Sequence, residues 1–154
     1  MLRYVPEGGA SPMESIVALL LSLPTSLGGY GLPVPRMNAS LSVPQTLRHV
    51  GHRAHVMPDL LWESSKVFLE YDSDMHHVGA DRIASDARRR DALLGMGYSV
   101  VTRTRTQYND VREFDQLAKM LARLMGLRVR VRRKDFAEQR DKTRYLLGSG
   151  HLIG

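Results

Sequence analysis

Residues 55–73 constrain the fold more than any other stretch, because they hold two apolar, β-prone runs around a short polar turn. The runs span residues 55–63 and 66–73, and the turn reads ESSK. Two such runs joined by a few polar residues are typical of a β-hairpin. A turn that is symmetric about its two serines places Asp59 directly opposite Glu70. We therefore expect a hairpin with this register.

The second run of the hairpin is rich in acids. Glu70, Asp72 and Asp74 occupy alternate positions, so in a strand they share one face. Opposed residues have Cβ atoms about 4.5–5.5 Å apart, and two carboxylates that close, such as Asp59 and Glu70, share either a proton or a cation. Oxygen-only clusters favour Mg²⁺ or Mn²⁺, so we expect a divalent metal site. The alternative is that these acids decorate a solvated strand edge.

The rest of the chain alternates between helical and strand patterns, which predicts one α/β domain. At its start, Ser11, Pro12 and Glu14 have the spacing of an N-cap, a first-turn proline and a capping-box glutamate, and Pro24 ends that helix. The elements expected after it are a loop or lid over residues 25–38, strands over 39–43 and 98–104, helices over 79–95, 111–125 and 135–147, and a strand over 127–133.

Two of these helices have an apolar face that we expect to point inward. In the helix expected over 79–95 the apolar face consists of Ala80, Ile83, Ala87 and Leu94. In the helix expected over 111–125 it consists of Val111, Phe114, Leu117, Leu121 and Leu124.

Positive charge is concentrated near the C-terminus. The net charge is +6, and residues 128–144 hold eight of the lysines and arginines against three acids. In a strand over 127–133, Arg128, Arg130 and Arg132 form one face, which predicts contacts with a polyanion, most simply DNA. An edge strand protected by charge, or a solvated basic segment, is the alternative.

Other features exclude several classes of protein. The 154 residues contain no cysteine, which excludes a disulfide scaffold and Cys-ligated zinc. The longest apolar run, residues 16–23, is too short to span a bilayer, and it lacks the flanks of a signal peptide. We therefore expect a cytoplasmic protein with no membrane association, and a homodimer stays open.

Three stretches together resemble the PD-(D/E)xK nuclease superfamily, and most closely the bacterial branch that contains very-short-patch-repair (Vsr) endonucleases. They read PDLLW, VFLEYDSDMHH and DARRRDALLGMGYSVVTRT, and the resemblance covers roughly residues 11–124. It implies a restriction-endonuclease-like core, in which helices flank a central mixed β-sheet, and magnesium-dependent hydrolysis of DNA phosphodiester bonds. Residues 1–126 would form this core, and residues 127–154 a basic extension, a strand plus a helix, packed on the same domain.

The resemblance also implies roles for individual residues. Asp59 matches the central metal-binding aspartate, Glu70 and Asp72 fall on the D/E-x-K motif, and His77 matches the histidine after that strand. Glu14 resembles the acid of the N-terminal helix that completes such sites, although its capping-box role is the alternative. Asp59, Glu70 and Asp72 would be the metal ligands, and Arg89 would support the site or contact a phosphate.

The chain departs from the motif at one position, where Asp72 replaces the lysine. That lysine orients the attacking water in related enzymes, so two functions follow from the resemblance. One is an active, Mg²⁺- or Mn²⁺-dependent DNA endonuclease. The other is a catalytically inactive, DNA-binding or regulatory module with the same fold, such as the C-terminal domain of a longer AbiEi-type antitoxin or regulator.

Overall fold

A mixed β-sheet forms the centre of the computed structural model, which describes residues 11–48, 54–72 and 79–148, Asp72 by its backbone alone. Within these residues the strands are β1 (Arg36–Met37), β4 (Leu60–Trp62), β5 (Val67–Asp72) and β6 (Ser99–Thr104), in the order β1-β4-β5-β6. The pair β5–β6 is parallel, and the other two pairs are antiparallel. Strands β2 (Leu41–Ser42) and β3 (His55–Val56) form a separate antiparallel pair.

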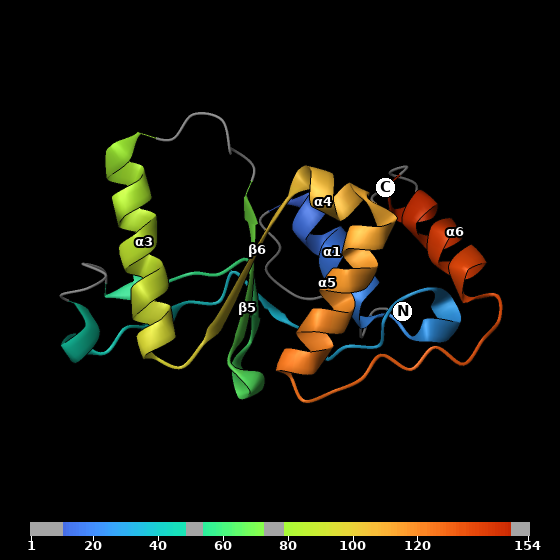
Figure 1. Cartoon of the computed structure of the whole chain (residues 1–154), viewed down its shortest axis with the longest axis horizontal. Helices are drawn as coiled ribbons and strands as arrows, with labels where there is room; N and C mark the ends of the chain where they lie inside the picture. Colours follow the sequence, from blue (N-terminus) through green and yellow to red (C-terminus); the bar gives the residue numbers. More distant parts are fainter. Residues whose placement is uncertain (1–10, 49–53, 73–78, 149–154) are drawn as a thin grey trace.

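Helices cover both faces of this sheet, which confirms the predicted mixed α/β class. Figure 1 shows α3 (Ala80–Gly95) on one side of β5 and β6, and α1 (Pro12–Ser22), α4 (Arg105–Asn109) and α5 (Val111–Leu124) on the other. Helix α6 (Phe136–Gly148) lies beyond α5. The short 3-10 helices are η2 (Thr25–Leu27), η3 (Gln45–Leu47) and η4 (Glu63–Ser65).

The predicted hairpin register is confirmed. Strands β4 and β5 pair Leu60 with Leu69 and Trp62 with Val67, which is the register of a turn symmetric about the two serines. The turn itself is η4, closed by Lys66 in the left-handed region at φ +52°. The first run is less regular than expected, because β3 and β4 are separate strands and Asp59 lies in a bend between them.

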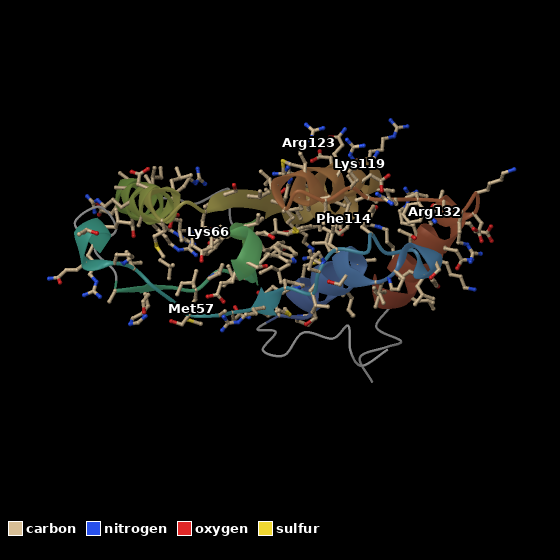
Figure 2. The ribbon with its side chains drawn as sticks, turned by 90° about the horizontal axis from the view of Figure 1, so that it is seen from below. Met57, Lys66, Phe114, Lys119, Arg123 and Arg132 are labelled. Atoms are coloured by element: carbon tan, nitrogen blue, oxygen red, sulfur yellow. The ribbon has the colours of Figure 1, made fainter. Side chains whose placement is uncertain are left out.

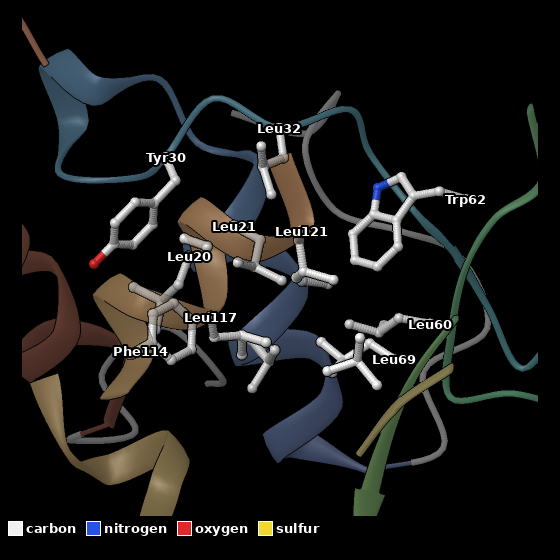
Figure 3. Close-up of a cluster of buried hydrophobic side chains, with 14 of the residues drawn as sticks. Leu20, Leu21, Tyr30, Leu32, Leu60, Trp62, Leu69, Phe114, Leu117 and Leu121 are labelled. Atoms are coloured by element: carbon white, nitrogen blue, oxygen red, sulfur yellow. The ribbon is translucent and has the colours of Figure 1, made fainter. Parts of the chain in front are cut away.

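Two hydrophobic cores lie on opposite faces of the sheet. The larger one packs α1 and α5 against the strand residues Leu60, Trp62, Val67 and Leu69, and Figure 3 shows its leucines interleaved with Phe114 and Trp62. The smaller core, on the α3 side, contains Phe68. Alternate residues of β5 therefore serve different cores, as side chains do in a strand buried on both faces.

The predicted inward face of α3 is wrong. Ile83 is 59% exposed and Leu94 is 55% exposed, whereas the buried residues of this helix are Ala92 and Leu93. An arginine, Arg89, lies one turn before them and turns toward β5 to bond a carboxylate. A charged residue at an inner position hides the true apolar face from a pattern of hydrophobic residues alone.

The prediction for α5 is confirmed for Phe114, Leu117 and Leu121, which are buried, whereas Leu124 is 40% exposed. The predicted strand over residues 127–133 is wrong, because that segment has no regular structure. Its alternating pattern lacks a paired neighbour, and a strand needs one to satisfy its backbone groups.

Helix α6 is nevertheless attached firmly to the larger core. Leu147 is buried in that core, and the Thr143 hydroxyl donates to the carbonyl of Leu27 at 2.7 Å. Arg140 forms an ion pair with Asp115 of α5 at 2.8 Å, and Asp115 also accepts a hydrogen bond from the Tyr30 hydroxyl. The loop that carries Tyr30 is thus tied to α5 and α6, so this part of the predicted lid belongs to the core.

We predict opposite outcomes for two neighbouring leucines of α3. Leu93→Ala should lower the free energy of unfolding by about 2–5 kcal/mol, because Leu93 is 1% exposed and its removal leaves a cavity. Leu94→Ala, at an exposed position of the same helix, should change it by less than about 1 kcal/mol. Urea denaturation of both variants measures this difference, and a larger loss for Leu94→Ala would refute the orientation of the helix.

Candidate functional site

Asp59 is held against the end of the hairpin by the backbone of β5. It follows Pro58, which has no N–H to give to a ladder, and the β4–β5 pairing ends at Leu60 and Leu69. The Oδ2 atom of Asp59 accepts a hydrogen bond of 2.6 Å from the backbone N–H of Tyr71. The carboxylate therefore replaces the next rung of the ladder, and its orientation is fixed.

A second carboxylate reaches the same place from α1. Glu14 lies in the first turn of that helix, whose N-cap Ser11 accepts from the backbone N–H of Glu14 as predicted. Glu14 and Asp59 both line a small cavity of about 10 Å³ between α1 and β5, roughly the room that one water-sized sphere needs. The N-terminal helix thus contributes an acid next to Asp59.

Asn38 links the two acids. Its side-chain amide donates to Oε2 of Glu14 at 3.2 Å, and its backbone N–H donates to the carbonyl of Asp59 at 3.1 Å. Asn38 adopts φ +48°, a left-handed conformation that asparagine tolerates better than most residues. No pattern in the sequence singles out Asn38, which is the last residue of the loop over 25–38, because its partners lie in distant segments.

The environment of Asp59 disfavours its charged form. Burial is the largest cause that raises the pKa of this carboxyl above its ordinary value, and the charges of Glu14 and Glu70 raise it further. The Tyr71 N–H and the Arg89 guanidinium lower the pKa in part. A cation or a proton near Asp59 would therefore be favourable.

Glu70 is neutralised by Arg89 of α3. The guanidinium donates from Nη1 to Oε2 at 2.9 Å and from Nη2 to Oε1, so the pair is bidentate. Arg89 also donates to the carbonyl of Met57 at 3.3 Å. The side chains of Arg89 and Glu70 are 23% and 17% exposed, so the pair is partly shielded from water.

The two predicted metal ligands therefore line different spaces on either side of β5. Asp59 turns toward α1, whereas Glu70 lines a polar cleft of about 150 Å³ beneath α3, together with Asp86, Arg90 and Thr102. Asp59 and Glu70 therefore line separate cavities, although the charge of Glu70 still acts on Asp59. Among the described residues, no group of three or more acids or histidines is arranged to hold a metal ion.

Several predicted site residues lie elsewhere or outside the described part of the chain. The backbone of Asp72 pairs with Thr104 of β6, but its side chain is outside the described residues, as are Asp74 and His77. Arg128, Arg130 and Arg132 are exposed in the irregular segment after α5. These arginines do not lie on one strand face, and their contact with DNA stays a prediction.

Comparison with known proteins adds no family assignment: no family model, curated protein or solved structure matches this chain. In the part of the chain that the structure describes, no helix is long and apolar enough to cross a membrane.

We predict that Asp59→Asn stabilises the protein at pH 7. The raised pKa means that ionised Asp59 costs stability above that pKa, and that this cost disappears as the pH falls through it toward the ordinary carboxyl value of about 4. Asparagine retains an oxygen for the Tyr71 N–H. Urea unfolding at pH 7 and pH 4 should therefore show a gain that shrinks at the lower pH. Asp91→Asn, at an exposed position of α3, is the control, and destabilisation by Asp59→Asn at pH 7 would contradict the assignment.

We also predict that Arg89→Ala costs about 1–3 kcal/mol of stability, because it leaves the carboxylate of Glu70 without its bidentate donor. Arg88→Ala removes an exposed arginine from the same helix and should change stability by less than about 0.5 kcal/mol. Thermal unfolding in low salt compares the two variants. Equal effects would mean that the ion pair adds no stability.

Proposed function

We propose that this chain is a DNA endonuclease-like domain that hydrolyses phosphodiester bonds with the help of Mg²⁺ or Mn²⁺. The single observation that carries the proposal is the fixed, half-buried carboxylate of Asp59, which shares a cavity with Glu14 and whose pKa is raised. Carboxylates are seldom held together in partial burial unless a proton or cation offsets the repulsion. A site of this kind supports metal-assisted hydrolysis of DNA better than it supports binding of DNA alone.

The donor set fits a hard divalent cation in chemical type, since Glu14, Asp59, Glu70 and Asp72 provide only oxygen atoms. Asp59 would hold the ion together with Asp72, and Glu70 would join them only by turning from its own cavity toward Asp59. When bound, such an ion polarises a phosphodiester and lowers the pKa of a water molecule. Arg89 now occupies both oxygens of Glu70, so Glu70 would have to exchange this partner for the ion.

The chain's own residues have separable tasks under this proposal. Tyr71 and Asn38 orient Asp59 and Glu14 through the hydrogen bonds described above. Arg89 holds the carboxylate of Glu70 in place through its bidentate pair until substrate or metal arrives. His77 would accept a proton from the attacking water or contact a phosphate. The mixed sheet, with helices on both faces, is consistent with the restriction-endonuclease-like core that the motifs resemble.

Two observations favour the second candidate, a nuclease-fold module that binds DNA without cutting it. The bidentate pair with Arg89 satisfies Glu70 without any metal, and the motif lysine is replaced by Asp72. An acid that is already neutralised has less need of a cation. The two candidates therefore differ in one measurable property, which is metal-dependent cleavage.

We predict that the protein cleaves DNA with Mn²⁺ or Mg²⁺ but not with EDTA, and that Asp59→Asn and Glu70→Gln each lower the rate about a hundredfold or more. Plasmid, linear, mismatched and single-stranded DNA are tested in parallel. Glu63→Gln is the matched control, because Glu63 is an exposed acid at the opposite end of the same hairpin, paired with Arg36 at 2.5 Å.

Thermal unfolding separates the two candidates further. Mn²⁺ at about 100 times its dissociation constant stabilises a folded protein by about 2.7 kcal/mol. Stabilisation by Mn²⁺ that is lost in Asp59→Asn supports the metal site. DNA binding with neither cleavage nor a Mn²⁺ effect supports the inactive module, and cleavage that survives both substitutions contradicts our site.

A further inference from the structure

A basic groove lies at the C-terminal end of α5, far in sequence from the carboxylates. It has a volume of about 610 Å³, far more than the roughly 10–15 Å³ that a single water needs. One wall is α5, which contributes Lys119 and Arg123, and the other is the segment after the helix, which contributes Arg128. Leu127 and Val129 also line it. We call this the α5 groove.

The turn after α5 places the two walls together. Gly126 has φ +70° and donates its N–H to the carbonyl of Arg123 at 3.0 Å. The N–H of Leu127 donates to the carbonyl of Ala122 at 2.7 Å, which is the bonding of a glycine-closed helix end. A residue with a side chain would be strained at φ +70°, so Gly126 is needed for the chain to turn here.

The cations of the α5 groove have no acidic partner among the described residues. Lys119, Arg123 and Arg128 are exposed, and the ion pairs found in the described part of the chain involve other cations, such as Arg133 with Asp135 and Arg140 with Asp115. Lys119 and Arg123 are four residues apart on one helix face, a spacing at which like charges repel. Arg123 also lies in the last turn of α5, where a cation is favourable, but this does not account for Lys119 and Arg128.

The groove faces away from the protein core. Figure 2 shows Lys119 and Arg123 on the outer side of α5, with the side chain of Phe114 on its inner side. In Figure 1, α5 ends at the lower edge of the molecule, whereas β5 ends at the upper edge, near the candidate site. The α5 groove is thus a surface separate from the carboxylates.

We propose that the α5 groove binds the phosphate backbone of duplex nucleic acid through Lys119, Arg123 and Arg128. Phosphates carry a permanent charge, and arginine matches them with its planar fork of N–H donors. Among the residues that the structure describes, no aromatic side chain lines the groove, and binding of single strands relies on aromatic rings that stack on bases. The inference names a surface for the proposed DNA partner, but it does not require hydrolysis.

The groove also defines how the contact is made. Its cationic side chains come from a helix face and the turn after it, and Figure 2 shows Lys119 and Arg123 pointing outward from α5. The proposed contact is with the backbone, where most protein–DNA hydrogen bonds from lysine and arginine are made. Such binding has little dependence on sequence and a strong dependence on salt.

The test compares two triple variants that lower the net charge equally. The groove variant is Lys119→Gln/Arg123→Gln/Arg128→Gln. The control variant changes three exposed cations on α3 and α6 and is Arg82→Gln/Arg88→Gln/Lys142→Gln. Fluorescence anisotropy with a labelled 30-base-pair duplex, in EDTA and over a range of salt, measures binding without cleavage. We expect the groove variant to bind at least about tenfold more weakly, and its slope of log K against log salt to fall by about 2–3.

Each other outcome overturns the inference. Equal losses in both triple variants would mean that net charge alone attracts DNA, and no loss in the groove variant would place the contact elsewhere. Three further results would contradict a duplex-backbone site. The wild type could fail to bind the duplex, it could bind a single strand of equal length more tightly, or polyglutamate at equal charge could displace the duplex. Because EDTA is present throughout, absence of catalysis does not affect the result.

Discussion

Strand β5 is the constraint on which the rest of the structure depends. Val67, Phe68 and Leu69 are all fully buried, and the strand pairs with β4 on one side and with β6 on the other. Since side chains alternate along a strand, Leu69 enters the core beneath α1 and α5, whereas Phe68 enters the core beneath α3. A shift of one residue would exchange the two sets, so both cores fix the same register.

The same alternation decides where the acids lie. Glu70 follows Phe68 on the α3 side, where it meets Arg89, and Tyr71 follows Leu69 on the α1 side, where its ring stacks on Tyr108 with centroids 5.6 Å apart. The backbone N–H of Tyr71 is left for Asp59 because the ladder has ended. The position of each carboxylate is thus a consequence of how far β4 extends along β5.

Local chemistry made part of this fold predictable from the sequence. The N-cap at Ser11, the polar turn of the hairpin and the apolar face of α5 each depend on residues close together in the chain, and the structure has all three. The alternation of apolar and basic residues over 127–133 predicted a strand wrongly, because such a pattern forms a strand only where a neighbouring strand pairs with it. For α3, Arg89 takes an inner position that hydrophobicity assigns to an apolar residue.

The candidate site was predictable in its residues but not in its geometry. Asp59 and Glu70 stand out by type and spacing, whereas the contact of Glu14 with Asn38 joins segments that no local pattern relates. Asn38 adopts the left-handed conformation that directs its amide to Glu14 and its N–H to Asp59. This arrangement depends on the packing of α1 on the sheet, so sequence periodicity carries no sign of it.

The unequal surroundings of the two acids refine the chemistry proposed for them. Glu70 has a bidentate guanidinium partner, whereas the pKa of Asp59 is raised by burial and by two neighbouring carboxylates. A cation therefore gains most electrostatic energy on the Asp59 side of β5, next to Glu14, and least where Arg89 already neutralises the charge. Glu14 then becomes as important to the proposed metal site as the residues of the hairpin. Ser11 caps the helix by accepting from the backbone N–H of Glu14, whereas the Glu14 carboxylate accepts from Asn38 and lines the cavity beside Asp59.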